Sequence, residues 1–112
     1  MKTLKNFTPR ILVVGDLMID HYLWGSCGRI SPEAPVQVVD ISKETTVLGG
    51  AGNVISNLKA LGADVDVVSV IGDDDNGVEL IKMLKSIDVN SSNINMQKGR
   101  KTSKKSRVIA VS

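Results

Sequence analysis

Apolar residues follow two different periods along the chain, and the change between them predicts where strands and helices lie. Residues 10–16 (RILVVGD) form a short, continuous apolar run ending in Gly-Asp, which is typical of a strand buried on both faces. Residues 35–43 alternate in part and predict a strand with one face in solvent. Residues 64–74 again have strand character, and residues 107–112 begin a further strand.

Two segments have the period of an amphipathic helix instead. The first has its apolar positions at Val54, Leu58 and Leu61. The second has its apolar positions at Leu80, Ile81, Leu84 and Ile87. Gly62 stands where the first helix would end, and Asp74, Asp75 or Asn76 is available to cap the start of the second.

The order of these elements predicts the class of the fold. Strands that alternate with helices indicate an α/β protein with a mostly parallel sheet and right-handed crossovers. Residues 35–47 interrupt that rhythm and could form a separate small sheet. The last strand signal is followed by no turn, so we interpret the sequence as the front part of a larger fold.

Composition adds a few limits to this picture. The 112 residues suffice for one small domain, and an aromatic content of 3% means that the core is built from Val, Ile and Leu. Cys27 is the single cysteine, so no disulfide can form within the chain and a reducing compartment is indicated. Asp16 and Asp20 interrupt the apolar run near the N-terminus, which argues against a signal peptide or membrane span and for a cytoplasmic protein.

The charge is unevenly distributed, although its net value is only +2. Every acidic residue lies at or before Asp88. A later run contains six basic residues: Lys98, Arg100, Lys101, Lys104, Lys105 and Arg107. Such a run can bind nucleic acid, but it is more often a solvated face or a contact to a small-molecule phosphate. Because no aromatic residue within it could stack on bases, nucleic-acid binding is disfavoured.

The glycines at 49, 50 and 52 directly precede the first predicted helix. They do not form a dinucleotide fingerprint, since the last glycine is missing, nor a P-loop, since Gly-Lys-Ser/Thr is absent. One interpretation is a tight turn between strand and helix with no ligand. The other is that helix N–H groups, together with the amide of Asn53, bind hydroxyl or phosphate oxygens, an amide being better suited to a sugar than to a bare anion.

Acidic residues follow the first strand at the edge where open α/β sheets bind ligands. Asp16 and Asp20 could accept hydrogen bonds from paired hydroxyl groups, or Asp16 could cap a turn and leave only Asp20 to reach a ligand. His21 is more easily explained as structural than as a metal ligand. The three aspartates at 73–75 point in divergent directions, so helix capping explains them better than a metal site.

These motifs resemble those of a known family. The stretch GGAGNV, followed by Gly62 and Gly72, resembles the N-terminal signature of the ribokinase (PfkB) family of carbohydrate kinases, and VVGDLMIDHYLWG resembles its first strand with its sugar-binding aspartate. More narrowly, GRISPEAPVQVVD and TSKKSRVIA resemble the branch that phosphorylates D-glycero-β-D-manno-heptose 7-phosphate, which is often fused to an adenylyltransferase of ADP-heptose synthesis. The resemblance covers about residues 10–112, and Ile55 departs from the small residue usual at its position.

The resemblance implies a ribokinase-like three-layer α/β sheet with a small β lid. Residues 1–112 would form the N-terminal part of the kinase domain, with lid strands at about 29–48 and 105–112. Trp24 would pack at the base of the lid. Lids of this family often pair between subunits, so the resemblance also implies a homodimer.

The resemblance further implies a set of substrate-binding residues: Asp16, Asp20, Gly49, Gly50, Asn53, Lys105 and Arg107. Asp20, with Asp16 as its neighbour, and Asn53 would bind sugar hydroxyls. Gly49 and Gly50 would let the backbone approach the sugar. Lys105 and Arg107 would bind the 7-phosphate, arginine through two parallel N–H bonds and lysine as a point charge.

The implied reaction is phosphoryl transfer from ATP to the anomeric O1 of the sugar, with Mg²⁺ bridging the phosphates. In this family the catalytic aspartate, the Gly-Ala-Gly-Asp anion hole and the ATP pocket lie downstream of the motifs matched here. We therefore expect them beyond Ser112, and we expect the 112 residues alone to hold no catalytic residue, to bind no metal and to bind ATP and Mg²⁺ poorly. We also expect the isolated chain to self-associate or fold marginally.

Two other functions stay open from the sequence. Another sugar or nucleoside kinase of the same family would share the glycine motif and the acidic residues. A non-catalytic α/β module with a basic nucleic-acid-binding tail would account for the cationic run. We expect a sugar phosphate as the ligand, and neither nucleic acid nor a membrane as a partner.

Overall fold

The computed structural model describes residues 7–111 except 31, 32 and 34, so the Ser-Pro-Glu-Ala-Pro part of the heptose-branch motif lies largely outside the described residues. Its elements in chain order are β1 (Arg10–Val14), β2 (Leu17–Ile30), β3 (Gln37–Gly50), α2 (Ala51–Ala60), β4 (Asp64–Gly72), α3 (Asp75–Ser86), β5 (Ile94–Gln97) and β6 (Ser103–Val111). Strands and helices alternate from β3 to β5, as the hydrophobic pattern predicts, and β6 follows β5 without a helix between them.

The strands form two separate sheets, each of three strands among the residues described. The first, which we call the parallel sheet, has the order β1-β4-β5, and all its pairs are parallel. The second, which we call the long sheet, has the order β3-β2-β6, with β2 antiparallel to β3 and parallel to β6. The separate sheet expected around 35–47 is thus confirmed, but it also takes in β2 and therefore begins well before the lid strands expected at about 29–48 and 105–112.

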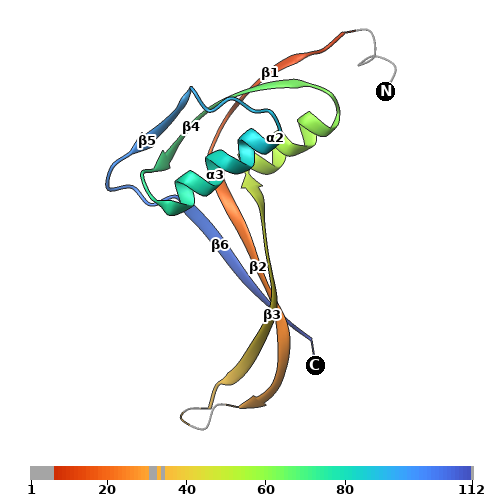
Figure 1. Cartoon of the computed structure of the whole chain (residues 1–112), viewed down its shortest axis with the longest axis vertical. Coiled ribbons are helices and arrows are strands. Elements are labelled where there is room, and N and C mark those ends of the chain that lie inside the picture. The colour runs from red at the N-terminus through yellow and green to blue at the C-terminus, as the bar shows by residue number, and fades with distance from the viewer. Residues whose placement is uncertain (1–6, 31–32, 34, 112) are drawn as a thin grey trace.

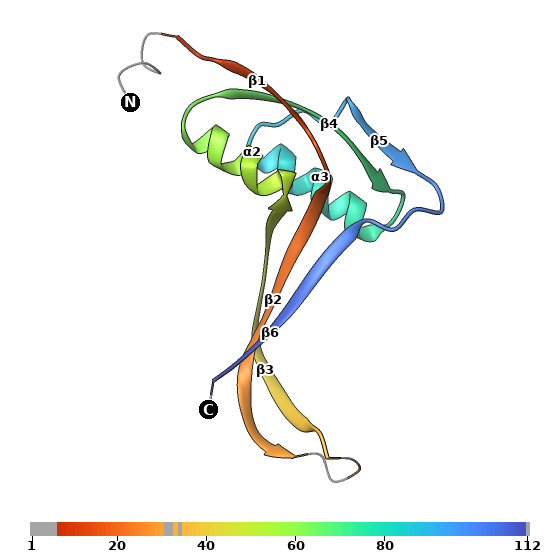
Figure 2. The ribbon, with the colours of Figure 1, turned by 180° about the vertical axis from the view of Figure 1, so that it is seen from behind.

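The long sheet projects away from the rest of the molecule (Figure 1). Helices α2 and α3 lie next to the parallel sheet, and β2, β3 and β6 extend from this body as a twisted arm; the reverse view shows the same separation (Figure 2). The chain accordingly measures 61 × 39 × 18 Å along its principal axes. Only the root of the arm, where β2 begins and β3 ends, contributes to the core.

The core is aliphatic, as the composition predicts. Its fully buried side chains come from both helices, from β4, from the root of the long sheet and from the connection after α3: Ile19, Ile55, Val67, Ile71, Leu80, Leu84 and Val89. Helix α3 begins at an aspartate cap, because the Asp74 side chain accepts a hydrogen bond from the Gly77 N–H at 2.8 Å. The predicted cap and the apolar stripe of this helix are confirmed.

The predicted buried face of α2 is right for Leu58, which packs against the core, and wrong for Val54 and Leu61. Ile55 is 0% exposed, whereas Val54 is 49% exposed and Leu61 is 52% exposed. The helix begins immediately after Gly50, whose φ of 57° sets the direction in which α2 leaves β3. That direction places Gly52 and Ile55 against the sheet, so the residue that departs from the family pattern lies in the core.

The prediction that β1 is buried on both faces is also wrong for the described residues. Leu12 is 59% exposed and Val14 is 69% exposed, while Ile11 and Val13 face the core. On the neighbouring β4, Val68 is 41% exposed. Helices α2 and α3 lie on one side of the parallel sheet (Figures 1 and 2), and the apolar side chains on its other face are exposed. Self-association of the isolated chain stays a prediction, and this open face is its physical basis.

Neither helix in the described part of the chain is long and apolar enough to cross a membrane. The strand β5 has only four residues, of which Ile94 alone is buried, and the hydrophobic pattern did not predict it.

Ile55 and Val54 are adjacent in α2, and substituting each in turn tests directly which face of the helix is buried. We expect Ile55→Ala to lower the free energy of unfolding by about 2–5 kcal/mol, because it leaves a cavity in the core. Val54→Ala, on the exposed face of the same helix, should change it by less than about 0.5 kcal/mol. Urea unfolding followed by circular dichroism measures both values, and equal losses for the two variants would contradict this packing.

Candidate functional site

The predicted site residues meet where the two sheets join. Asp16 lies in the connection between β1 and β2, and Asp20 lies four residues further on, within β2 rather than in a loop. In the strand register, Asp20 is opposite Val47 of β3 and opposite Lys105 of β6. Gly49 lies two residues beyond Val47 and therefore on the same face of the long sheet.

We call this side of the long sheet the Asp20 face. It carries Asp20, Gly49, Lys105 and Arg107, the last because it pairs with Tyr22, two residues after Asp20. Four of the seven predicted substrate-binding residues thus share one surface, although they come from three strands and span 88 positions of the sequence.

Gly49 is buried, and the Asp20 carboxylate lies directly against it. A Cβ atom added at Gly49 would stand 2.6 Å from Cγ and 2.6 Å from Oδ2 of Asp20, so a side chain there would force the carboxylate to move. The bare Cα therefore accommodates the carboxylate itself. This is the structural reason for a glycine at this position, and the expected approach of a sugar to the backbone stays a prediction.

Gly50 holds the turn between β3 and α2. Its φ of 57° lies in the left-handed region, where glycine is favoured, and a Cβ there would stand 2.6 Å from the backbone oxygen of Asp16. That oxygen accepts a hydrogen bond from the Ala51 N–H at 2.9 Å. The side chain of Asp16 is exposed, so its backbone oxygen supports the turn while its carboxylate faces solvent.

Asn53 lies in the first turn of α2, which starts beside the Asp20 carboxylate. Asn53 is exposed three residues after Gly50, and its approach to the same sugar as Asp20 stays a prediction. The start of α2 has no side-chain cap and no acidic residue in its first turn. The Ala51 N–H donates to Asp16, so the N–H groups of the first turn that could bind oxygen atoms of a ligand are those after Ala51.

The charged side chains of the Asp20 face make few internal contacts. Within residues 7–111, as far as they are described, the Asp20 carboxylate forms no hydrogen bond or ion pair and is half-buried. Lys105, on the adjacent strand, is exposed. Neighbouring strands lie about 4.8 Å apart, so a carboxylate and an ammonium group border the same short stretch of surface.

The basic run does not form one continuous surface. Lys105 and Arg107 lie on the Asp20 face, whereas Lys104 pairs with Ile19 and points to the opposite face. Lys98, Arg100 and Lys101 precede β6 in the exposed connection from β5. This division favours contacts to a small phosphate group by two residues over a broad electrostatic surface.

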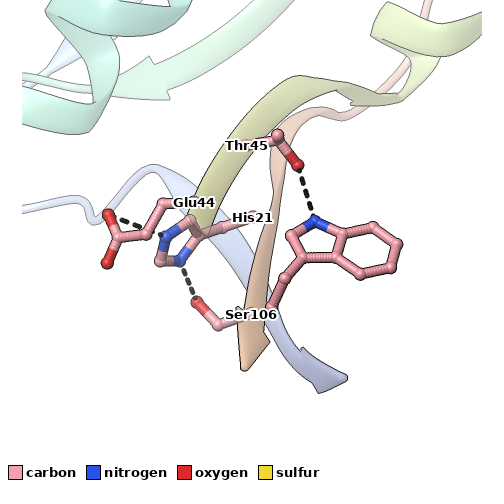
Figure 3. Close-up of polar contacts among 5 residues, drawn as sticks. His21, Glu44, Thr45 and Ser106 are labelled. Atoms are coloured by element: carbon pink, nitrogen blue, oxygen red, sulfur yellow. Dashed lines mark hydrogen bonds and ion pairs between the residues drawn. The ribbon is translucent and has the colours of Figure 1, made fainter. Parts of the chain in front are cut away.

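The opposite face of the long sheet holds His21 in a structural cluster. Its Nδ1 atom forms a 2.9 Å hydrogen bond with Oγ of Ser106, and its Nε2 atom lies 3.7 Å from Glu44 (Figure 3). Trp24 lies on the Asp20 face, where its indole N–H donates to Oγ1 of Thr45 at 3.3 Å. His21 thus contacts one residue from each neighbouring strand, which agrees with the structural role predicted for it.

Asp74 has more partners than a helix cap requires. Its carboxylate accepts hydrogen bonds from the Thr102 hydroxyl at 2.7 Å and from the Thr102 N–H at 2.8 Å, besides that from Gly77. The Thr102 hydroxyl, its N–H and then the Gly77 N–H stabilise the charged form and lower the pKa of Asp74 below 3.8, although partial burial opposes them. Asp73 and Asp75 point into solvent. In the described parts of the chain, no three His, Cys, Asp or Glu side chains gather as a metal site.

Sequence reasoning missed Thr102. It is 6% exposed and lies 28 residues from Asp74, at the start of the basic run, where the sequence pattern indicates only a polar connection. A threonine between charged residues carries no local signal of burial. Its partner could be found only from the fold.

The sequence is similar to that of known carbohydrate kinases and bifunctional proteins. A model of the pfkB family carbohydrate kinases matches residues 8–112. The bifunctional protein HldE of Sulfurimonas denitrificans is 77% identical over 112 residues, which are 100% of this chain and 24% of that protein. The bifunctional protein HldE of Aliarcobacter butzleri is 67% identical over 102 residues, covering 91% of this chain and 21% of that protein. The chain therefore spans about a quarter of the length of these curated relatives.

Solved structures share the fold. A putative ribokinase from Agrobacterium tumefaciens matches with a TM-score of 0.72 at 15% identity, over 93% of this chain and 33% of that one. Ribokinase from Arabidopsis thaliana, complexed with ribose and ATP, matches with a TM-score of 0.71 at 18% identity over the same shares. The predicted ribokinase-like α/β fold is confirmed, and this chain corresponds to about a third of each of those structures.

The stabilisation supplied by the hydrogen bonds of Asp74 can be tested by measuring stability at different pH values. Because the folded pKa lies below the unfolded value near 3.8, the stabilisation is present above that value and is lost as the pH falls through the folded pKa. We expect the Asp74→Asn variant to be less stable than the parent protein at pH 6. The difference in stability should shrink as the pH falls below 3.8. Urea midpoints between pH 3 and pH 6 measure the difference. Asp75→Asn, in the exposed first turn of the same helix, is the control, and a difference independent of pH would contradict the assignment.

Proposed function

This chain belongs to the pfkB family of carbohydrate kinases, and from that premise we propose that it supplies the sugar-binding part of a kinase for D-glycero-β-D-manno-heptose 7-phosphate. The enzyme would transfer a phosphoryl group from ATP to the anomeric O1 oxygen, a step of ADP-heptose synthesis. The observation that carries the proposal is the Asp20 carboxylate, which lies against Gly49 on the same face as two cations.

The geometry around Asp20 suits hydroxyl groups of a sugar. A carboxylate accepts hydrogen bonds from two adjacent hydroxyls, and this one has no internal donor among the described residues. The uncapped start of α2 and the Asn53 amide supply donors close by. Asp16 borders the same turn through its backbone and would contribute its exposed carboxylate at the rim of the site.

The two cations favour a phosphorylated sugar over a neutral one. Lys105 is opposite Asp20, and Arg107 is two residues further along the same strand. A sugar whose hydroxyls bind Asp20 would thus present a phosphate at its other end to these side chains, arginine as a fork and lysine as a point charge. This spacing is our reason for preferring a sugar phosphate to a nucleoside.

The nucleotide part of the reaction is not assigned to these residues. The 112-residue sequence has no Gly-Ala-Gly-Asp motif, and its described residues hold no cluster of metal ligands. ATP and Mg²⁺ would bind to the remaining part of the kinase, where ATP supplies the phosphoryl group. What the present residues do is orient the sugar and bind its charged end.

We further propose that the long sheet is the lid of this enzyme and that it pairs with the same sheet of a second subunit. Both of its outer strands have an exposed edge, and the apolar side chains of Val47 and Val108 lie in solvent, at 46% and 56% exposure. Open edges of this kind favour pairing with another chain. The single cysteine fits a reducing compartment, and we place the enzyme in the cytoplasm.

The test uses a chimera in which these 112 residues replace the matching segment of the HldE protein from Sulfurimonas denitrificans. We expect the chimera to phosphorylate heptose 7-phosphate with ATP. Asp20→Asn should lower kcat/KM about 10- to 100-fold, because a charged acceptor of sugar hydroxyls is replaced by a neutral amide of the same shape. Asp16→Asn, at the rim, should have a smaller effect.

Several outcomes would contradict the proposal. A chimera that phosphorylates nucleosides in preference to heptose 7-phosphate would indicate the other kinase class. An Asp20→Asn variant as active as the parent would remove the assigned role of the carboxylate. Binding of the 112-residue chain to nonspecific DNA with a steep salt dependence would favour the nucleic-acid module.

The isolated 112-residue chain should have no kinase activity. Its sequence lacks the Gly-Ala-Gly-Asp motif, so we expect ADP production in a coupled assay to equal that of the mixture without protein. The chimera serves as the positive control in the same assay. Heptose-dependent turnover by the isolated chain would show that the phosphoryl-transfer site lies within these residues.

A further inference from the structure

Thr102 is unusual in its surroundings because it is almost fully buried. Its exposed fraction is 6%, while its neighbours Lys101 and Ser103 are exposed. It is the last residue before β6, the strand that carries Lys105 and Arg107. A buried threonine at this point therefore connects the core of the molecule to the cationic strand.

The hydrogen bonds of Thr102 tie three elements together at one point. Asp74, at the start of α3, accepts from both the N–H and the hydroxyl of Thr102, at 2.8 and 2.7 Å. The Gly72 N–H, at the end of β4, donates to the Thr102 hydroxyl oxygen at 2.9 Å. A side chain at Gly72 would collide with the backbone carbonyl of Arg100, so β4 and the β5–β6 connection touch through bare backbone. We call this group of contacts the Asp74–Thr102 latch.

The register of β6 decides which side chains reach the Asp20 face. With Ser103 opposite Met18, Lys105 falls opposite Asp20. Since side chains alternate along a strand, a shift by one residue would turn Lys105 away and bring Lys104 or Ser106 to the face instead. A slip of β6 by one residue would thus remove both Lys105 and Arg107 from the Asp20 face.

The strand itself contains little that would fix this register. It is an outer strand, and all its residues are exposed except Ile109, which is half-buried. Its first five residues, 103–107, are all polar, and a stretch that is polar on both faces specifies its register weakly. The 2.9 Å contact between His21 and Ser106 is a side-chain link on the opposite face, but Ser106 is itself exposed. The buried anchor lies immediately before the strand, at Thr102.

We propose that the Asp74–Thr102 latch sets the register of β6 and thereby keeps Lys105 and Arg107 on the Asp20 face. Asp74 and Thr102 are then positioning residues for the phosphate end of the substrate. This inference rests on the proposed function for its kinetic consequence, but the register of the strand is a structural property that can be measured separately.

Three substitutions separate this role from simple helix capping. Asp74→Asn keeps an oxygen that can cap α3 at Gly77, because asparagine is also a good cap, but it loses one of the two acceptors for Thr102. Thr102→Val keeps the branched shape and removes the hydroxyl that binds Asp74 and Gly72. Thr102→Ser keeps the hydroxyl and should restore the latch.

The experiment uses the chimera and compares heptose 7-phosphate with unphosphorylated heptose as substrates. We expect Asp74→Asn and Thr102→Val to raise KM for the 7-phosphate about tenfold, with kcat changed less than threefold and with unaltered kinetics on unphosphorylated heptose. Thr102→Ser and the control Asp75→Asn should stay within twofold of the parent. In a chimera that carries Lys105→Ala and Arg107→Ala, Thr102→Val should add less than twofold, because the side chains it positions are gone.

Hydrogen exchange of the β6 amides supplies a readout that does not depend on activity. We expect residues 103–107 to exchange at least tenfold faster in Thr102→Val than in Thr102→Ser, with exchange in α3 unchanged. If the parent chimera phosphorylates no sugar phosphate, the proposed function fails, while this exchange pattern still decides the register role.

The inference itself would be overturned by either of two results. One is an unchanged KM for the 7-phosphate together with unchanged exchange in β6. The other is an equal loss of activity on both sugars with faster exchange throughout the molecule, which is the behaviour of a merely destabilised fold. Should Thr102→Val fail to fold, Asp74→Asn compared with Asp75→Asn gives the same two readouts.

Discussion

The candidate site depends on a carboxylate that occupies the space where residue 49 would otherwise have a side chain. With Gly49 in place, Asp20 fits against the backbone of β3, half-buried and without an internal donor among the described residues. This contact joins the two strands at the root of the long sheet, next to the start of α2. The Asp20 carboxylate therefore lies directly beside the turn at Gly50 and the start of α2.

The same root explains why the site is built from two sheets. The parallel sheet and its helices supply a rigid body, and the long sheet supplies the charged side chains. Asp16 links them, because its carbonyl receives the first N–H of α2 while its neighbours begin β2. The body thus fixes Asp20 directly, whereas β6 is held by its pairing with β2 and, at its start, by the buried hydrogen bonds of Thr102.

Local patterns in the sequence predicted some features well and others poorly. The Asp74 cap, the apolar stripe of α3 and the glycine turn were predictable, because each is set by residues within a few positions. The buried face of α2 was not, because Val54 and Ile55 both fit a helical period and only the path of the chain from Gly50 into the helix decides between them. Nor was Thr102 predictable, since its partner Asp74 is 28 residues away. The strand register places four of the predicted site residues on one face of the long sheet: Asp20, Gly49, Lys105 and Arg107. The family motifs implied this grouping, but the hydrophobic pattern alone could not predict it.

The parallel pairing of β6 with β2 also has a consequence for the order of folding during synthesis. The hairpin of β2 and β3 closes over a short connection, whereas His21 and Ser106 are separated by 85 residues. Contacts between such distant segments form late, because a long intervening chain must first be ordered. On the ribosome, the edge of β2 therefore stays open until β6 emerges, and Lys105 and Arg107 join the Asp20 face after Asp20 and Gly49.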